Sequence, residues 1–157
     1  MELPSACAKV ADAFEQVGWP VSVVIHEQSS RTAEEAANAC QCEQGQIVKS
    51  LIFSRADTDD IILLLVSGSN RVHENRTGRQ IGAKLKRADI HRVREETGFA
   101  IGGIPPYGHK AKLETYVDED LLKYPDVWAA AGTPNSVFNI DPNQLTKITE
   151  AKVVCVK

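Results

Sequence analysis

The sequence lacks any long hydrophobic run. Its longest unbroken apolar stretch, residues 61–66, is far shorter than the roughly 20 residues that a membrane-spanning helix needs. Residues 1–4 also lack the positive charge with which an export signal begins. We therefore expect a soluble, cytoplasmic protein with no membrane among its partners.

Cysteine is scarce and is not arranged as a metal site. The four cysteines form no Cys-x-x-Cys pair, and no His-x-x-x-His accompanies them, which argues against structural zinc. We interpret them as small apolar side chains in a reducing compartment, with a metal or redox site at Cys40 and Cys42 as the alternative. The sequence thus predicts no metal.

Several catalytic motifs are also missing. There is no Gly-x-Ser-x-Gly elbow, no Gly-x-x-x-x-Gly-Lys phosphate loop, no Gly-x-Gly-x-x-Gly and no His-Glu-x-x-His, which disfavours covalent hydrolases, nucleotide hydrolases, Rossmann enzymes and zinc proteases. The four histidines are scattered along the chain. Only His109 borders a loop with a candidate function.

What is present is the composition of an ordinary globular protein, with 157 residues of which 43% are hydrophobic and 25% charged. Folding at this length hides roughly 70% of the surface of the unfolded chain, whereas two separate cores would each be undersized. We expect a single domain over residues 1–157.

Short helix and strand patterns alternate along the chain without a regular βαβ repeat, which predicts an α+β domain with a curved, mixed sheet. Apolar residues at helical spacing before Gly18 predict a first helix, and Thr32 with Glu35 forms a capping box that opens a second one. Strands are predicted at residues 21–26, 46–55, 61–67, 113–117, 127–131, 136–140 and 152–156. Further short helices are predicted at residues 89–97 and 118–124 and after Asp141-Pro142.

Positive charge is concentrated in one segment. Residues 71–94 sum to +6, although the whole chain carries −3. Such a block suits contacts with phosphates of a polyanion, and a solvated helix face explains the same pattern. A capping box at residues 77–80 and an apolar stripe of Ile81, Leu85 and Ala88 predict one helix here, from which Arg79, Lys86 and Arg87 point outward.

Lys49 interrupts an apolar row. In a strand it shares one face with Leu51 and Phe53, while Ser50 and Ile52 take the other. A buried ammonium needs an acceptor or loses its proton, and a ligand oxygen in a cavity would serve. The alternatives are that the Ser50 face is the buried one, or that the lysine stem reaches out to water.

A glycine-proline loop is the second feature that suits chemistry. Its glycines permit close approach of a substrate to bare amides, and its prolines stiffen the chain. A structural turn between two strands is the alternative explanation. The loop consists of Gly102, Gly103, Ile104, Pro105, Pro106, Tyr107, Gly108 and His109.

Three ordered motifs resemble the YbaK/ProX family of aminoacyl-tRNA deacylases, relatives of the editing domain inserted in bacterial prolyl-tRNA synthetase. They are residues 46–51 around Lys49, residues 102–109, and residues 131–135. The resemblance covers almost the whole chain. It implies a mostly antiparallel, barrel-like sheet flanked by helices, and hydrolysis of the ester that joins a wrong amino acid to tRNA.

The resemblance also implies roles for residues. Lys49 would be the essential lysine that positions the terminal adenosine and the ester, and the water would be activated by the substrate itself. No metal, nucleotide or other cofactor and no DNA is implied; aminoacyl-tRNA is the expected partner, with prolyl-tRNA synthetase as a further candidate. The residues expected to bind substrate are Gly102, Gly103, Ile104, Pro105, Pro106, His109, Gly132, Thr133, Asn135 and His26, and those expected to contact tRNA are Arg79, Lys86 and Arg87.

Departures from the family pattern bear on the substrate. The branch that clears cysteinyl-tRNA usually has Ser before the loop proline and an Arg-Gly-Leu-Asp lip, where this chain has Pro105 and residues 133–137. His26 falls near a tyrosine of that branch. We therefore expect a small aliphatic or similarly sized amino acid on tRNA specific for proline or a related acceptor. The alternatives are a non-catalytic tRNA-binding or synthetase-associated module, and hydrolysis of a small ester or amide other than aminoacyl-tRNA.

Overall fold

The computed structural model of the protein describes residues 3–157. Its helices are α1 (Ser5–Gln16), α2 (Ala33–Cys40), α3 (Glu74–Ile81), α4 (Ile90–Thr97) and α5 (Pro142–Thr149), with short 3-10 helices η1 (Gln44–Gln46) and η2 (Glu119–Lys123). None of the helices in residues 3–157 combines the length and the apolar character that a membrane crossing requires.

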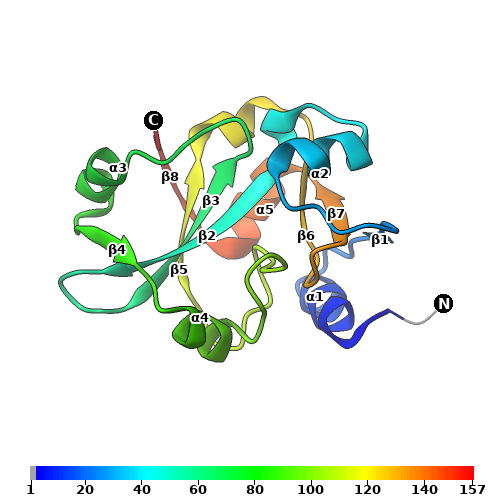
Figure 1. The fold of residues 1–157 in the computed structure, drawn as a ribbon, viewed down its shortest axis with the longest axis horizontal. Coiled ribbons are helices and arrows are strands. Elements are labelled where there is room, and N and C mark those ends of the chain that lie inside the picture. The colour runs from blue at the N-terminus through cyan, green and yellow to red at the C-terminus, as the bar shows by residue number, and fades with distance from the viewer. Residues whose placement is uncertain (1–2) are drawn as a thin grey trace.

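The strands form two sheets that lie side by side (Figure 1). The larger sheet has the order β4-β2-β3-β5-β8, and the smaller has the order β1-β7-β6. All pairings are antiparallel except β3 with β5 and β5 with β8. The strands are β1 (Val23–Ile25), β2 (Val48–Arg55), β3 (Ile61–Ser67), β4 (Leu85–Arg87), β5 (Glu114–Asp118), β6 (Val127–Ala130), β7 (Ser136–Ile140) and β8 (Lys152–Val154).

The two sheets meet near the start of β2. Ile47 forms an isolated parallel bridge with Trp128 at β6, and the Gln46 side-chain amide donates to the backbone carbonyl and the carboxylate of Asp126 at 3.1 and 2.9 Å. The prediction of an α+β fold with a mixed, mostly antiparallel, barrel-like sheet is confirmed. The barrel is not closed, because a single bridge joins the two sheets within residues 3–157.

The core lies on both sides of β3, whose seven residues are all buried. Alternate side chains of β3 enter two clusters: Leu63 and Leu65 pack in the larger one with α1 and the small sheet, and Ile62 and Leu64 pack in the smaller one with Leu85. Full burial on both faces explains why this strand is apolar throughout.

The side chains expected to begin helices do so in three places. Thr32 Oγ1 accepts from the backbone N–H of Glu35 at 3.1 Å, Asp89 caps α4 and Asp141 caps α5. Each cap satisfies backbone donors that the first turn of a helix leaves free. These helix starts were therefore readable from local sequence.

The prediction of one helix from residue 77 to residue 88 is wrong. Helix α3 begins at Glu74 with His73 as its cap, and it ends at Gly82, whose φ of +91° is a left-handed conformation that stops a helix. Residues Leu85–Arg87 then form β4, which pairs with the end of β2. The apparent helical stripe is divided, because Leu85 packs in the smaller cluster and Ala88 packs against the larger one.

Candidate active site

Lys49 lines a cavity of about 300 Å³ between the two sheets. Its walls come from four places in the chain: the first half of β2, the residues around the start of α2, the loop 101–104, and β6 with the turn that follows it. In Figure 1, β6 and α2 lie at the same end of β2. The cavity therefore gathers segments that are far apart in the sequence.

An interruption of the larger sheet makes room for this cavity. One edge of β2 pairs with β3 along its length, whereas the other edge contacts Trp128 at Ile47 and pairs with β4 only from Phe53 onward. Between these contacts, no strand in the described part of the chain pairs with residues 49–52 on that edge. Lys49, Ser50 and Leu51 line the cavity there.

The first half of the glycine-proline loop forms one wall. Gly102 and Ile104 line the cavity, and Gly103 packs against the turn after β6. A Cβ placed on Gly103 would lie 2.7 Å from Thr133 Cα and 2.8 Å from the Gly132 carbonyl carbon. Only glycine permits this approach of two backbones, so the loop and the turn support each other.

The second half of the loop faces elsewhere. Pro105 and Pro106 are buried, and His109 Nε2 donates to the Pro105 carbonyl at 2.6 Å. His109, Pro106 and Tyr107 line a different cavity of about 400 Å³, between the loop, α1 and α5. Burial lowers the pKa of His109, and its contact with the Pro105 carbonyl partly offsets this effect. His109 thus holds the loop through the Pro105 carbonyl, on the side away from the Lys49 cavity.

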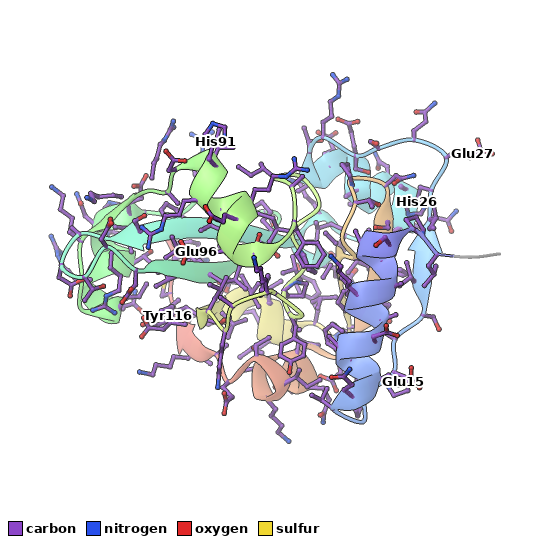
Figure 2. The ribbon with its side chains drawn as sticks, turned by 90° about the horizontal axis from the view of Figure 1, so that it is seen from below. Glu15, His26, Glu27, His91, Glu96 and Tyr116 are labelled. Carbon is purple, nitrogen blue, oxygen red and sulfur yellow. The ribbon has the colours of Figure 1, made fainter. Side chains whose placement is uncertain are left out.

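The turn after β6 forms the opposite lip. Thr133 and Pro134 line the cavity, whereas Asn135 secures the turn: its side chain donates to the His26 carbonyl at 2.9 Å, and its own carbonyl accepts from the His26 N–H at 2.8 Å. The His26 imidazole lies 3.9 Å from Cys40 Sγ. His26 and His91, on α4, lie well apart (Figure 2).

Charge in the cavity has one sign. Its lining includes the cations Arg31 and Lys49 and no carboxylate among the described residues. Lys49 Nζ donates to the backbone carbonyl of Asn70 at 2.5 Å. Burial lowers the pKa of Lys49, with nearby Arg71 acting in the same direction and Asp118 opposing them. A polarised carbonyl or a phosphate oxygen is the type of group that such a site attracts.

Two further observations limit the chemistry. Within residues 3–157, no three His, Cys, Asp or Glu side chains come together as a metal ion would require. The Ser50 hydroxyl is buried and has no hydrogen-bond partner among the described residues, although buried polar groups are normally paired. It is therefore an unpaired polar group beside the cavity.

The expected tRNA contacts lie at the other end of β2. Arg79, on α3, and Lys86 and Arg87, on β4, are exposed, and Figure 1 shows both elements far from α2. Arg87 pairs with Phe53, four residues along the strand from Lys49, which corresponds to about 13 Å at about 3.3 Å per residue. The described residues place no carboxylate within ion-pair distance of these three cations.

Comparison with known proteins identifies this arrangement. The sequence profile of the aminoacyl-tRNA editing domain matches residues 27–148, which include Lys49, the glycine-proline loop and the lip. The chain belongs to the aminoacyl-tRNA editing domain family.

Relatives of this editing domain agree with the assignment. A solved structure described as that of a candidate trans-editing enzyme for prolyl-tRNA synthetase is 46% identical, with a TM-score of 0.93 over 99% of each chain. The uncharacterized protein YwhH of Bacillus subtilis (strain 168) is 32% identical over 89% of this chain and 88% of its own. The proline–tRNA ligase of Brachyspira hyodysenteriae (strain ATCC 49526 / WA1) is 24% identical over 65% of this chain, which matches 18% of the ligase.

The cavity of the editing domain brings together only part of the predicted site. Lys49, Gly102, Ile104 and Thr133 line it. The other predicted substrate-binding residues support its walls or lie behind them, and the three predicted tRNA contacts lie apart. Sequence reasoning missed Arg31, Ser50 and Trp128, which also line the cavity. No local sequence pattern marked Trp128 or Arg31 as residues of a site. Ser50 was placed on the face of β2 opposite Lys49 and was given no role in the site.

Proposed function

We propose that this editing domain hydrolyses the ester bond of a mischarged aminoacyl-tRNA as a free-standing enzyme. Water adds to the ester carbonyl carbon, the bond to the ribose oxygen breaks, and a proton passes to that oxygen, which yields a free amino acid and intact tRNA. The observation that carries the proposal is the Lys49 ammonium in a cavity beside Gly102, Ile104 and Thr133.

The site suits this reaction because an aminoacyl ester is already activated. It needs orientation and polarisation of its carbonyl more than a strong protein base. We propose that Lys49 donates to the ester carbonyl or to the terminal adenosine, and that a ribose hydroxyl of the substrate activates the water. This division of labour agrees with a cavity whose described lining contains no histidine, cysteine or carboxylate.

The size of the cavity supports a small amino acid as the substrate. A volume of about 300 Å³ lies at the lower end of the range for small-molecule sites, and the lining is largely apolar around Ile104 and Ala129. The binding free energies of amino acids that differ by one methylene differ by only about 1 to 3 kcal/mol. Exclusion of larger amino acids by the size of the cavity would therefore add selectivity that binding affinity alone does not supply. The relatives linked to prolyl-tRNA synthetase support tRNA for proline as the acceptor and that synthetase as a partner.

The basic surface supports the recognition of tRNA. We propose that Arg79, Lys86 and Arg87 contact phosphates of the acceptor stem while the aminoacylated end enters the cavity. Phosphate contacts by Lys and Arg supply affinity without reading sequence.

A panel of mischarged tRNAs tests the proposal. We expect the wild type to release at least one small amino acid, and Lys49→Ala to lower the rate at least a hundredfold. Lys152→Ala, at an exposed lysine of β8, is the matched control and should retain the wild-type rate.

Three outcomes would contradict the proposal. Full activity of Lys49→Ala would show that the ammonium is not needed. Binding of tRNA without hydrolysis would select a non-catalytic module. Equal rates on free aminoacyl esters and on aminoacyl-tRNA would point to a small-ester hydrolase.

A further inference from the structure

The Lys49 ammonium is held by a backbone carbonyl of the segment that follows β3. Its Nζ donates to the Asn70 carbonyl at 2.5 Å, and no carboxylate of residues 3–157 lies within ion-pair distance of it. An ammonium has three N–H donors. One contact with a neutral acceptor therefore fixes its direction and leaves donors for a ligand.

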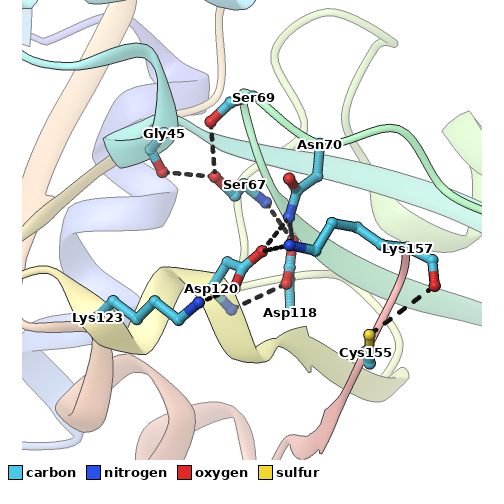
Figure 3. A network of polar contacts seen from close by, with 9 residues as sticks. All are labelled: Gly45, Ser67, Ser69, Asn70, Asp118, Asp120, Lys123, Cys155 and Lys157. Atoms are coloured by element: carbon cyan, nitrogen blue, oxygen red, sulfur yellow. Dashed lines mark hydrogen bonds and ion pairs between the residues drawn. The ribbon is translucent and has the colours of Figure 1, made fainter.

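The side chain of Asn70 is itself clamped between two carboxylates. Its Nδ2 donates to Asp118 Oδ2 and to Asp120 Oδ2, both at 2.8 Å (Figure 3). Both amide hydrogens are thus used. The clamped amide and the carbonyl that binds Lys49 belong to one residue, so the two carboxylates, together with the bond from the Asn70 N–H to the Ser67 carbonyl at 2.9 Å, hold that residue in place.

The carboxylates are in turn fixed. Asp118 is 1% exposed and accepts from the backbone N–H groups of Ser67 at 3.0 Å and Asp120 at 2.9 Å. Asp120 pairs with Lys123 at 2.6 Å and with Lys157 at 3.0 Å. The network in Figure 3 therefore runs from the surface to the residue that contacts Lys49.

We propose that Asn70 is a positioning residue, which holds the Lys49 ammonium at the cavity because Asp118 and Asp120 clamp it. The inference deepens the proposed function and rests on it for the role of Lys49. The two carboxylates have different tasks: Asp120 orients the Asn70 side chain, and Asp118 also acts on the charge of Lys49.

Several charged groups face Lys49. Asp118, at the end of β5, favours the charged amine, whereas Arg71, after β3, disfavours it. Arg31, before α2, lines the same cavity and adds positive charge, and Asp120, on η2, lies beyond Asn70. Since burial lowers the pKa of Lys49, the buried Asp118 carboxylate helps to keep the amine protonated.

Kinetics of three variants test the clamp. We expect Asn70→Ala to lower kcat for deacylation at least tenfold, with a change in KM below threefold, because the carbonyl is no longer aimed. Asn70→Ala combined with Lys49→Ala should be no slower than Lys49→Ala alone, since both changes remove one function. Lys112→Ala, which removes an exposed ion pair with Glu150 outside this network, is the control and should retain kcat.

Titration of Lys49 gives a readout that needs no turnover. The 13Cε signal of Lys49, assigned by its absence in Lys49→Arg, reports the pKa of the amine. In Asp118→Asn the loss of negative charge should lower that pKa further, and the alkaline limb of the rate profile should move to lower pH by the same amount. Asp120→Asn, which keeps the Asp118 charge, should leave the pKa within 0.3 units, about 0.4 kcal/mol.

The outcomes separate the two proposals. An unchanged kcat in Asn70→Ala, additive losses in the double variant, or an unaltered Lys49 pKa in Asp118→Asn would overturn the positioning role. A wild type that deacylates no aminoacyl-tRNA would overturn the proposed function, and the titration would still decide whether Asp118 acts on Lys49. If Asn70→Ala does not fold, Asn70→Ser and the titration decide in its place.

Discussion

At the residue scale, the side chains of β2 show what alternation can and cannot predict. Alternation correctly separated Lys49, Leu51 and Phe53 from Ser50 and Ile52. In the structure, Leu51 and Phe53 pack against the smaller cluster and Ile52 against the larger one, so both faces are covered. The alternation in β2 could not predict the other walls of the cavity, which come from distant segments: the resemblance pointed to the loop and the lip, whereas the contributions of Trp128 on β6 and of the residues around the start of α2 were not predicted.

The partly buried His109 should make stability depend on pH. Because burial lowers its pKa from 6.5, the unfolded chain binds the proton more readily than the folded protein does. The free energy of unfolding should have its full value above about pH 6.5 and should decrease as the pH falls toward the lower pKa of the folded state.

Urea unfolding between pH 5 and pH 7.5 checks this expectation. His109→Gln retains an N–H donor for the Pro105 carbonyl but no titrating group, so it should lose part of the pH dependence. His91→Gln, at an exposed position of α4, should retain the wild-type dependence. Identical pH curves for the wild type and His109→Gln would contradict the assignment.

At the element scale, the close contact between the glycine-proline loop and the turn after β6 sets the distance between two walls. The Cβ of Gly103→Ala would meet the backbone of Gly132 and Thr133 at 2.7 to 2.8 Å, and backbone yields less easily than a side chain. We expect a loss of about 1 to 3 kcal/mol in the free energy of unfolding and a clear reduction of deacylation per folded molecule.

Gly18→Ala is the control for this change. Gly18 has a φ of +78° and no atom within 4 Å of an added Cβ, so alanine there should cost about 1 kcal/mol through backbone strain alone. Denaturant unfolding and deacylation rates measured on both variants separate the two effects. Equal deacylation rates in Gly103→Ala and Gly18→Ala would show that the contact does not shape the cavity.

The helices and strands also show where local sequence is sufficient to predict secondary structure. Helices α2, α4 and α5 were predicted because the caps Thr32, Asp89 and Asp141 act on their own first turns. Strand β4 was missed because its three residues are defined by pairing with the far end of β2. Pairing between distant segments overrides a weak helical period, and no local pattern reports it.

At the scale of the whole molecule, the charge segregation predicts how the proposed binding of tRNA should respond to salt. Arg79, Lys86 and Arg87 are exposed and, among residues 3–157, have no acidic partner. Each phosphate contact lowers the slope of log K against log salt by roughly 0.9. Replacing all three with alanine should therefore reduce the magnitude of the slope by up to about 2.7.

Binding of uncharged tRNA measured from 50 to 300 mM salt checks this prediction. Arg92 provides the control, because it pairs with Asp59 at 3.3 Å and with Glu96 and is less available to phosphate. Arg92→Ala should change the slope by less than the change per residue in the triple variant. A triple variant with the wild-type slope would show that this surface is only solvated.

The assembly of the cavity from distant segments has a consequence for biosynthesis. Lys49 emerges from the ribosome long before Trp128 and Thr133, which complete the cavity, and before Gly132, whose turn packs closely against Gly103 and the backbone of Ala6. Until then, β6 does not cover the cavity edge of β2, and such an uncovered edge on a nascent chain is open to aggregation. A product truncated before β6 would contain Lys49 and the glycine-proline loop but would lack the walls that complete the cavity.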